Sequence, residues 1–208
     1  MEIISHRGYW KTIAEKNQPV AFERSFSLGF GTETDFRDYL GEVVIAHDIA
    51  TPLNITAQQC FGIYNQHICK RILALNIKAD GLQQKLKSLL EEYSIENYFV
   101  FDMSIPDTIG YMKKGIKFFS RQSEYEPIPA FYKECDGIWL DAFIDTWYDM
   151  GLIKEHIENC KKVAIVSPDL HNRDVFSLWE KLKEAEIDKL DGVILCTDIP
   201  EKAKAYFK

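Results

Sequence analysis

The strongest constraint on the fold is a regular alternation between short apolar runs and amphipathic stretches along the whole chain. The runs with the composition of β-strands are Glu2–Ser5, Thr32–Arg37, Val43–Ala46, Arg71–Ile77, Tyr98–Met103, Ile116–Ser120, Gly137–Leu140, Lys162–Ser167 and Gly192–Thr197. Some of them contain unbroken apolar sequences such as VAIV and GVILC. Such sequences are typical of strands buried on both faces of a parallel sheet.

Helical patterns separate most of these runs. We expect helices over Pro19–Leu28, Thr56–Cys69, Asp107–Lys114, Ile128–Glu134, Asp145–Cys160 and Pro200–Phe207, and two more that begin at N-caps Asp80 and Asn172. The helix after Asp80 places its leucines on one face, as a helix that packs against a sheet requires. If Val43–Ala46 extends the strand before it, the chain contains eight strand–helix units.

Eight strands that are each followed by a helix predict an α/β fold, a compact (β/α)8 TIM barrel, at the small end of the size range of that fold. We expect a single domain over residues 1–208, because no linker or low-complexity segment marks a boundary. The alternative is a doubly wound open sheet. No GxGxxG turn follows the first strand, which argues against the dinucleotide-binding form of that alternative.

Composition narrows the classes of function. Twenty-five Lys and Arg residues stand against thirty-two Asp and Glu, a formal net charge of −7, and such an acidic chain is not expected to bind nucleic acid. We expect no membrane span, because no apolar run approaches the ~20 residues that a bilayer requires. The five cysteines form no CxxC pair, and the first residues do not resemble a signal peptide. These features predict reduced thiols and a cytoplasmic location. The oligomeric state stays open.

Polar residues mark the ends of the first predicted strands. The first strand ends in His6-Arg7-Gly8, the second contains Glu33-Thr34-Asp35, the extension after it ends in His47-Asp48, and the next barrel strand ends in Asn76-Ile77-Lys78. Functional side chains of a TIM barrel lie at the carboxyl ends of its strands. We therefore expect these residues to meet at one end of the barrel.

Glu33 and Asp35 are two positions apart, so on a strand their side chains point to the same face. Two buried carboxylates on one face need a cation, and a hard divalent ion such as Mg²⁺ or Ca²⁺ prefers oxygen ligands. Asn76 could add a neutral oxygen ligand from the next strand. Lys78 follows Asn76 by two positions, so its side chain points to the same face as that of Asn76. We therefore expect a metal site at Glu33, Asp35 and Asn76, with Lys78 beside it as an anion contact.

Two histidines next to an oxygen-ligated metal suit phosphoryl transfer. One imidazole can take a proton from the attacking hydroxyl while the other gives a proton to the leaving oxygen. The cations Arg7 and Lys78 could stabilise the charge on the phosphate oxygens.

The same residues carry a family resemblance. The stretch from Ile4 to Asp48 resembles the glycerophosphodiester phosphodiesterase family. The matching pieces are HRG at His6–Gly8, NQPVAFERSFSLG at Asn17–Gly29, ETD at Glu33–Asp35, HD at His47–Asp48, and LNIK at Leu75–Lys78, which is similar to the family's acidic-x-Lys strand. The resemblance covers the part of the chain up to Lys78.

The resemblance implies a barrel of the phosphatidylinositol-phospholipase-C type. It also implies that a neighbouring hydroxyl of the substrate cleaves the phosphodiester through a cyclic phosphate, with the help of a divalent metal. In this chain, His6 and His47 would then be acid and base. The carboxylates of the ETD motif would ligate the metal, and Arg7 and Lys78 would contact the phosphate.

The chain departs from the family pattern at two places. Asn76 stands where the family typically has Glu, which removes one negative charge from the metal site. The insertion that usually follows the strand of the second histidine is nearly absent. Sphingomyelinase-D-like enzymes share the two-histidine barrel and are a related alternative.

The later strand ends supply further candidates. Arg121 could bind phosphate, and Trp139, Asp141 and His171 could line the substrate pocket. The two histidines inside predicted helices are not expected to be catalytic. Together these features predict a metal-dependent hydrolase of small-molecule phosphodiesters. Two alternatives stay open: an inactive barrel that binds a phosphorylated sugar or lipid headgroup, and a lyase that stops at the cyclic phosphate.

Overall fold

The computed structural model describes residues 1–208. Its strands are β1 (Glu2–His6), β2 (Gly31–Tyr39), β3 (Glu42–Ile45), β4 (Leu73–Ile77), β5 (Tyr98–Phe101), β6 (Phe119–Gln122), β7 (Gly137–Leu140), β8 (Lys162–Val166) and β9 (Val193–Thr197). Its helices are α1 (Pro19–Ser27), α2 (Ala57–Gln66), α3 (Gln83–Glu92), α4 (Ile105–Lys113), α5 (Met150–Glu158), α6 (Phe176–Glu184) and α7 (Pro200–Tyr206).

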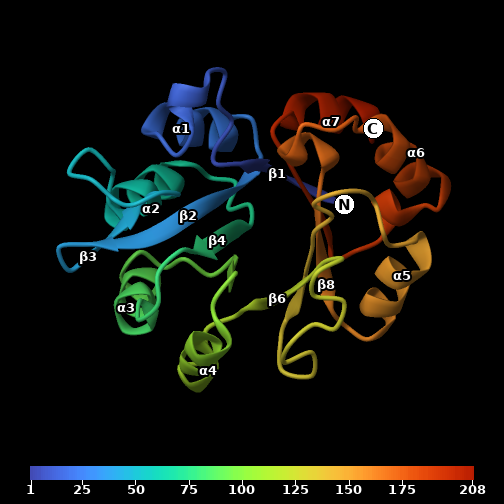
Figure 1. Cartoon of the computed structure of the whole chain (residues 1–208). Helices are drawn as coiled ribbons and strands as arrows, with labels where there is room; N and C mark the ends of the chain where they lie inside the picture. The colour runs from blue at the N-terminus through green and yellow to red at the C-terminus, as the bar shows by residue number, and fades with distance from the viewer.

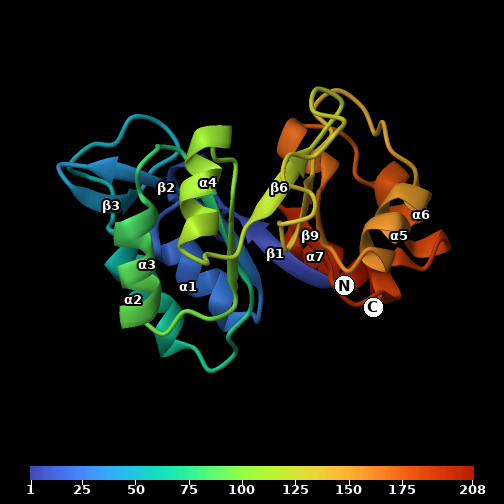
Figure 2. The same ribbon diagram turned by 90° about the horizontal axis from the view of Figure 1, so that it is seen from below.

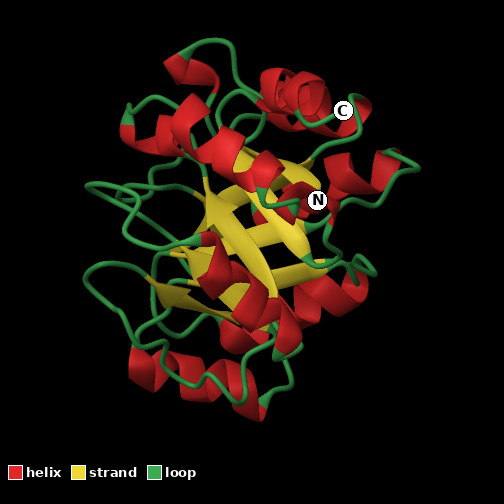
Figure 3. Cartoon of the chain, turned by 90° about the vertical axis from the view of Figure 1, so that its right-hand side faces the viewer, coloured by secondary structure: helices red, strands yellow, loops and turns green.

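Eight parallel strands form a nearly closed ring, and the helices lie outside it (Figures 1 and 3). The strands follow one another in the order β5-β4-β2-β1-β9-β8-β7-β6. The first and last strands are neighbours, with Ile4 opposite Cys196. Between β5 and β6 only one parallel bridge, Val100 to Phe118, completes the ring. The predicted (β/α)8 barrel is confirmed.

The strand β3 lies outside the ring. It pairs antiparallel with the far end of β2, and the two strands form an arm that projects from the barrel (Figures 1 and 2). The turn between them uses the left-handed residues Leu40 and Gly41, with φ of 48° and 83°. The arm returns the chain so that the Ala46 amide donates to the Asp35 carbonyl at 2.9 Å. His47 is thereby carried back to the end of β2.

Apolar side chains fill both faces of the ring, which explains why the strands are unbroken apolar runs. One cluster lies between strands and helices, and a smaller one lies inside the barrel. In the inner cluster Phe99 stacks on Phe119 with ring centroids 3.7 Å apart, and Phe101 stacks on Trp139 at 3.9 Å. These aromatic rings fill the barrel interior below the carboxyl ends of the strands. We call the end of the barrel at which the strands have their carboxyl ends the mouth.

The helix expected over Ile128–Glu134 is absent, and this prediction is wrong. The segment is a loop with one turn. Phe131 has a left-handed φ of 54°, a conformation that interrupts a right-handed helix. The Ser120 hydroxyl also donates to the Ala130 carbonyl and ties the loop to β6. The unit that begins with β6 therefore lacks its helix.

Three expected helix starts also differ from the structure. The helix expected from Asp145 begins at Met150, where the Asp149 side chain accepts from the Leu152 amide at 3.0 Å. Asp80 and Asn172 are not N-caps, because α3 and α6 begin three to four residues later. Asn172 instead ends a short 3-10 turn in a left-handed conformation. None of the helices has the length and apolar content needed to cross a membrane.

Candidate active site

A cavity of about 320 Å³ opens at the mouth of the barrel. Of the residues predicted from the sequence, it is lined by His6, Arg7, Glu33, His47, Asn76, Lys78, Arg121, Trp139, Asp141 and His171. Asp35 is the exception, because it is fully buried behind the lining residues. Asp102 lines the cavity as well. The structure thus brings together side chains from both halves of the chain.

The turn after β1 directs Arg7 toward the mouth. Arg7 and Gly8 are both left-handed, with φ of 58° and 78°. A Cβ atom at Gly8 would lie 2.7 Å from the Cβ of Ala21 in α1, so only glycine fits there. The Gly8 amide donates to the Thr32 hydroxyl at 2.9 Å and fixes the turn on β2.

Asn17 orients one of the two carboxylates. Its amide nitrogen donates to Asp35 Oδ2 at 2.8 Å, and its side-chain oxygen accepts from the Thr34 hydroxyl at 2.8 Å. Its backbone amide donates to the Arg7 carbonyl at 2.9 Å. Sequence reasoning quoted Asn17 only as part of a motif. The structure shows that it connects the β1 turn to Asp35.

Glu33 and Asp35 are both buried, but cationic side chains lie much closer to Asp35 than to Glu33. Arg7 Nε lies 3.0 Å from Asp35 Oδ2, and Lys78 Nζ lies 3.7 Å from Asp35 Oδ1. The side chain nearest to Glu33 that could carry a positive charge is His6, with Nε2 3.9 Å away. Burial, followed by the charge of Asp35, raises the pKa of Glu33 to about 7. The region around Glu33 is therefore short of positive charge.

The donor atoms at this place fit a hard cation. Asp35 and Asn76 lie directly opposite each other on β2 and β4. The Oδ1 atoms of both side chains are buried and have no hydrogen-bond partner. The carboxylate of Glu33 lies on the same face of β2, and all three donors are oxygens, as Mg²⁺ and Ca²⁺ prefer. No group of three or more His, Cys, Asp or Glu side chains is placed to hold a metal ion by itself, so a site at this place would include the Asn76 amide oxygen.

A carboxylate holds each candidate catalytic histidine by its Nδ1 atom. His6 Nδ1 lies 2.8 Å from Asp198 Oδ1, and His47 Nδ1 lies 2.9 Å from Asp48 Oδ1. A carboxylate accepts from Nδ1–H, which leaves Nε2 free to take a proton from another molecule. The His6 side chain is 13% exposed and that of His47 is 44% exposed. The two rings therefore lie at different depths of the cavity.

Sequence reasoning missed Asp198. This residue comes directly after β9 and also accepts from the Trp10 indole at 3.2 Å. A carboxylate at the end of the last predicted strand was the signal that could have revealed it.

Sequence reasoning also missed Asp102, which follows β5 with a left-handed φ of 69°. Its carboxylate lies 3.0 Å from Arg121 Nη1 and 3.6 Å from Lys78 Nζ. It therefore holds two of the predicted phosphate contacts in place. As with Asp198, the feature of the sequence that could have revealed Asp102 was an acidic residue at the end of a predicted strand.

The far side of the cavity combines aromatic and polar groups. Trp139 lies on the stacked aromatic rings of the barrel interior. His171 Nε2 lies 2.8 Å from Asp141 Oδ1, and the ring of Phe143 is 5.1 Å from the ring of His171. These side chains can shape the space around a bound molecule.

No family model and no curated protein sequence matches the chain. Solved structures do match. A proposed glycerophosphodiester phosphodiesterase from Galdieria sulphuraria superposes with a TM-score of 0.81 at 17% identity, over 99% of this chain and 97% of that chain. A glycerophosphodiester phosphodiesterase from Agrobacterium tumefaciens gives 0.71 at 13% identity, over 99% and 98% of the chains.

A phosphodiesterase from Oleispira antarctica, solved in complex with the product sn-glycerol-3-phosphate, gives a TM-score of 0.72 at 17% identity, over 99% of this chain and 96% of that chain. At these identities the likeness establishes the fold. The chemistry is therefore inferred from the residues that line the cavity at the mouth of the barrel.

Proposed function

We propose that the chain is a metal-dependent phosphodiesterase that cleaves a small glycerophosphodiester-like molecule. One observation carries the proposal: His6 and His47, each held by a carboxylate at Nδ1, share one cavity with the cations Arg7 and Lys78. Three structurally similar proteins bear phosphodiesterase names, and one of them is bound to sn-glycerol-3-phosphate. This agreement adds support.

Glu33, Asp35 and Asn76 are the residues that would hold the metal, Mg²⁺ or Ca²⁺. The buried Oδ1 atoms of Asp35 and Asn76, which have no hydrogen-bond partner, support this assignment. Once bound, such an ion would withdraw electron density from phosphate oxygens and favour ionisation of a nearby hydroxyl.

The two histidines divide the proton transfers. A hydroxyl of the substrate next to the diester attacks phosphorus while one imidazole takes its proton at Nε2. The other imidazole gives a proton to the oxygen of the departing alcohol, and a cyclic phosphate is left. Water then opens the cyclic phosphate with the two roles exchanged. A lyase would release the cyclic phosphate instead.

Three cationic side chains would contact the phosphate of the substrate. Arg7, Lys78 and Arg121 all line the cavity, and their charge would offset that of the phosphate oxygens as the transition state forms. Asp102 contacts Lys78 and Arg121 and would position them for this task.

We also propose a cytoplasmic location. All five cysteines are free, and none forms a disulfide. This is the usual state of thiols in a reducing compartment.

Substitution of the histidines tests the mechanism. His6→Ala and His47→Ala should each lower kcat by about 10²–10⁴-fold, the usual contribution of general acid–base catalysis. His67→Ala is the matched control, because His67 pairs with Glu23 outside the cavity. Phosphorus NMR of glycerophosphoethanolamine turnover measures the rates and also identifies a cyclic product.

Near-normal turnover by either histidine variant would contradict the acid–base assignment. Accumulation of the cyclic phosphate alone would favour the lyase. Binding of glycerophosphoethanolamine without any cleavage would favour the inactive barrel.

A further inference from the structure

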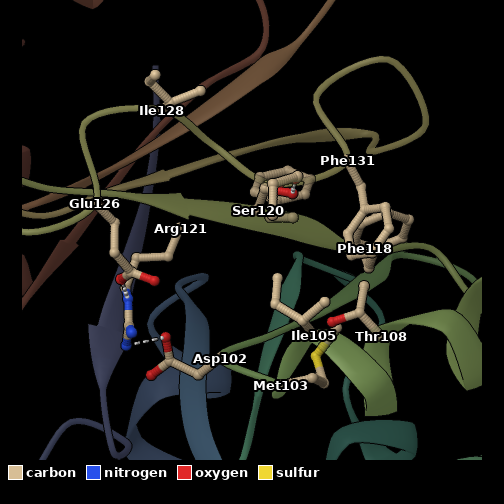
Figure 4. A pocket seen from close by; sticks show the side chains of 12 residues that line it. Asp102, Met103, Ile105, Thr108, Phe118, Ser120, Arg121, Glu126, Ile128 and Phe131 are labelled. Atoms are coloured by element: carbon tan, nitrogen blue, oxygen red, sulfur yellow. Dashed lines mark hydrogen bonds and ion pairs between the residues drawn. The ribbon is translucent and has the colours of Figure 1, made fainter.

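A second cavity, of about 250 Å³, lies beside the candidate active site between β5, α4 and β6. Seven of its twelve lining residues are hydrophobic, among them Met103, Ile105, Phe118 and Phe131 (Figure 4), and polar groups form about half of its surface. The phosphodiesterase mechanism proposed above does not use this cavity.

The cavity exists because the barrel wall is incomplete at this point. β5 and β6 share a single bridge, Val100 to Phe118, below the mouth. Nearer the mouth these two strands have no paired residues. The helix that would cover β6 is replaced by the loop that contains Ile128 and Phe131. A partly apolar cavity therefore lies beside the mouth, with this loop as part of its wall.

The two cavities meet at one ion pair. Asp102 and Arg121 line both of them, and Arg121 Nη1 lies 3.0 Å from Asp102 Oδ1 (Figure 4). Arg121 Nε also pairs with Glu126. A guanidinium has five N–H donors, so Arg121 can contact a phosphate while it keeps these two carboxylates.

The outer end of the apolar cavity carries exposed hydrophobic side chains. Ile105 is 54% exposed and Ile128 is 85% exposed. Apolar groups that continue from a cavity to the surface are typical of a site for an apolar ligand group. The cavity thus has the cation Arg121 at one end and exposed hydrophobic side chains at the other.

We propose that this cavity binds an apolar arm of the substrate. The substrate would then be a phosphodiester that carries an alkyl or acyl chain of several carbons, with its phosphate at Arg121 and its chain between α4 and β6. The proposal rests on the proposed function, because it uses the same phosphate position. Because Arg121 lines both cavities, a chain attached to a phosphate at Arg121 could enter the second cavity. We therefore assign this cavity to the substrate's own chain.

Calorimetric titration of two simple probes tests the assignment without catalysis. Hexyl phosphate and ethyl phosphate differ by four methylene groups, and each buried methylene strengthens binding by up to about fourfold. We expect hexyl phosphate to bind the wild-type protein more than about 10-fold tighter than ethyl phosphate. Ile105→Asn and Ile128→Asn should each reduce this ratio to less than about threefold, since they place a polar group in the path of the chain.

Matched controls are Ile109→Asn, on the same helix but outside the cavity lining, and Ile144→Asn, on an exposed loop. Both should keep the wild-type ratio. Equal affinities for the two probes, no binding of either probe, or a ratio that the Ile105 and Ile128 variants leave unchanged would overturn the assignment. Failure of the proposed function would look different: the chain preference would persist, but no phosphodiester would be cleaved.

Discussion

At the scale of single residues, Asn76 is the position where the chain departs most clearly from the pattern it resembles. It lies opposite Asp35, and its side-chain oxygen is buried without a partner. With Glu33 and Asp35 ionised, the three proposed ligands together carry a charge of −2. A carboxylate in place of the Asn76 amide would make this charge −3. Fewer anionic ligands attract a divalent ion less strongly. A substrate phosphate could supply the missing negative oxygen.

Asn76→Asp should therefore bind Mg²⁺ and Ca²⁺ more tightly than the wild-type protein in the absence of substrate. Asn76→Leu should bind them more weakly, because it removes the oxygen altogether. Calorimetric titration of each ion into the three proteins measures the difference. Identical affinities in all three would show that Asn76 is not a ligand.

Some site residues could be predicted from the sequence because their relation is local. Glu33 and Asp35 share a face through the two-residue period of a strand, and the His6-Arg7-Gly8 turn follows its strand directly. Asp198 could not be predicted in this way. It contacts His6 across 192 positions of sequence, and only closure of the barrel brings β9 beside β1. The pairing of Asp102 with Arg121 likewise depends on how β5 meets β6.

At the scale of elements, a buried histidine ties α5 to β6. His156 Nδ1 lies 2.8 Å from the Tyr132 hydroxyl, and Nε2 lies 2.8 Å from Gln122 Oε1. Gln122 in turn donates to the Pro127 carbonyl at 2.9 Å. A neutral ring satisfies both partners, with Nε2–H donating and Nδ1 accepting. These bonds anchor the loop that stands in place of the missing helix.

This arrangement predicts a pH dependence of stability. Burial lowers the pKa of His156 below its ordinary value of 6.5. As the pH falls below 6.5, the unfolded chain takes up a proton before the folded protein does, so the free energy of unfolding decreases. Above that pH the ring is neutral in both states, and this contribution is constant. Urea unfolding between pH 5 and 7.5 measures the effect.

His156→Gln should show a smaller decrease over that range, although it is less stable throughout because hydrogen bonds are lost. His67→Gln, at a partly exposed histidine, should keep the wild-type decrease. An unchanged slope in the His156 variant would refute the assignment of this pH dependence to His156.

Helix positions show what local sequence can and cannot determine. Thr56 was correctly expected to begin α2, where it forms a capping box with Gln59, because such a signal lies within one turn. The apolar spacing over Ile128–Glu134 resembled a helix as well. There, tertiary bonds from β6 and the left-handed Phe131 determine a loop, and neither feature has a local pattern.

At the scale of the whole molecule, the barrel gathers cations from distant parts of an acidic chain. The chain has a formal net charge of −7, yet three of the cavity's lining residues are Arg7, Lys78 and Arg121. Closure of the barrel brings these cations from β1, β4 and β6 to one mouth. The same lining contains the carboxylates of Glu33, Asp102 and Asp141, so a bound anion would rely on direct contacts with these cations and not on an excess of positive charge.

The central claim is metal-dependent phosphodiester cleavage at this mouth. Its most direct test is phosphorus NMR of glycerophosphoethanolamine incubated with the wild-type protein, first in EDTA and then after addition of excess Mg²⁺ or Ca²⁺. We predict no turnover in EDTA and recovery with at least one of the two ions. Full turnover in EDTA, or no turnover with either ion, would contradict the claim.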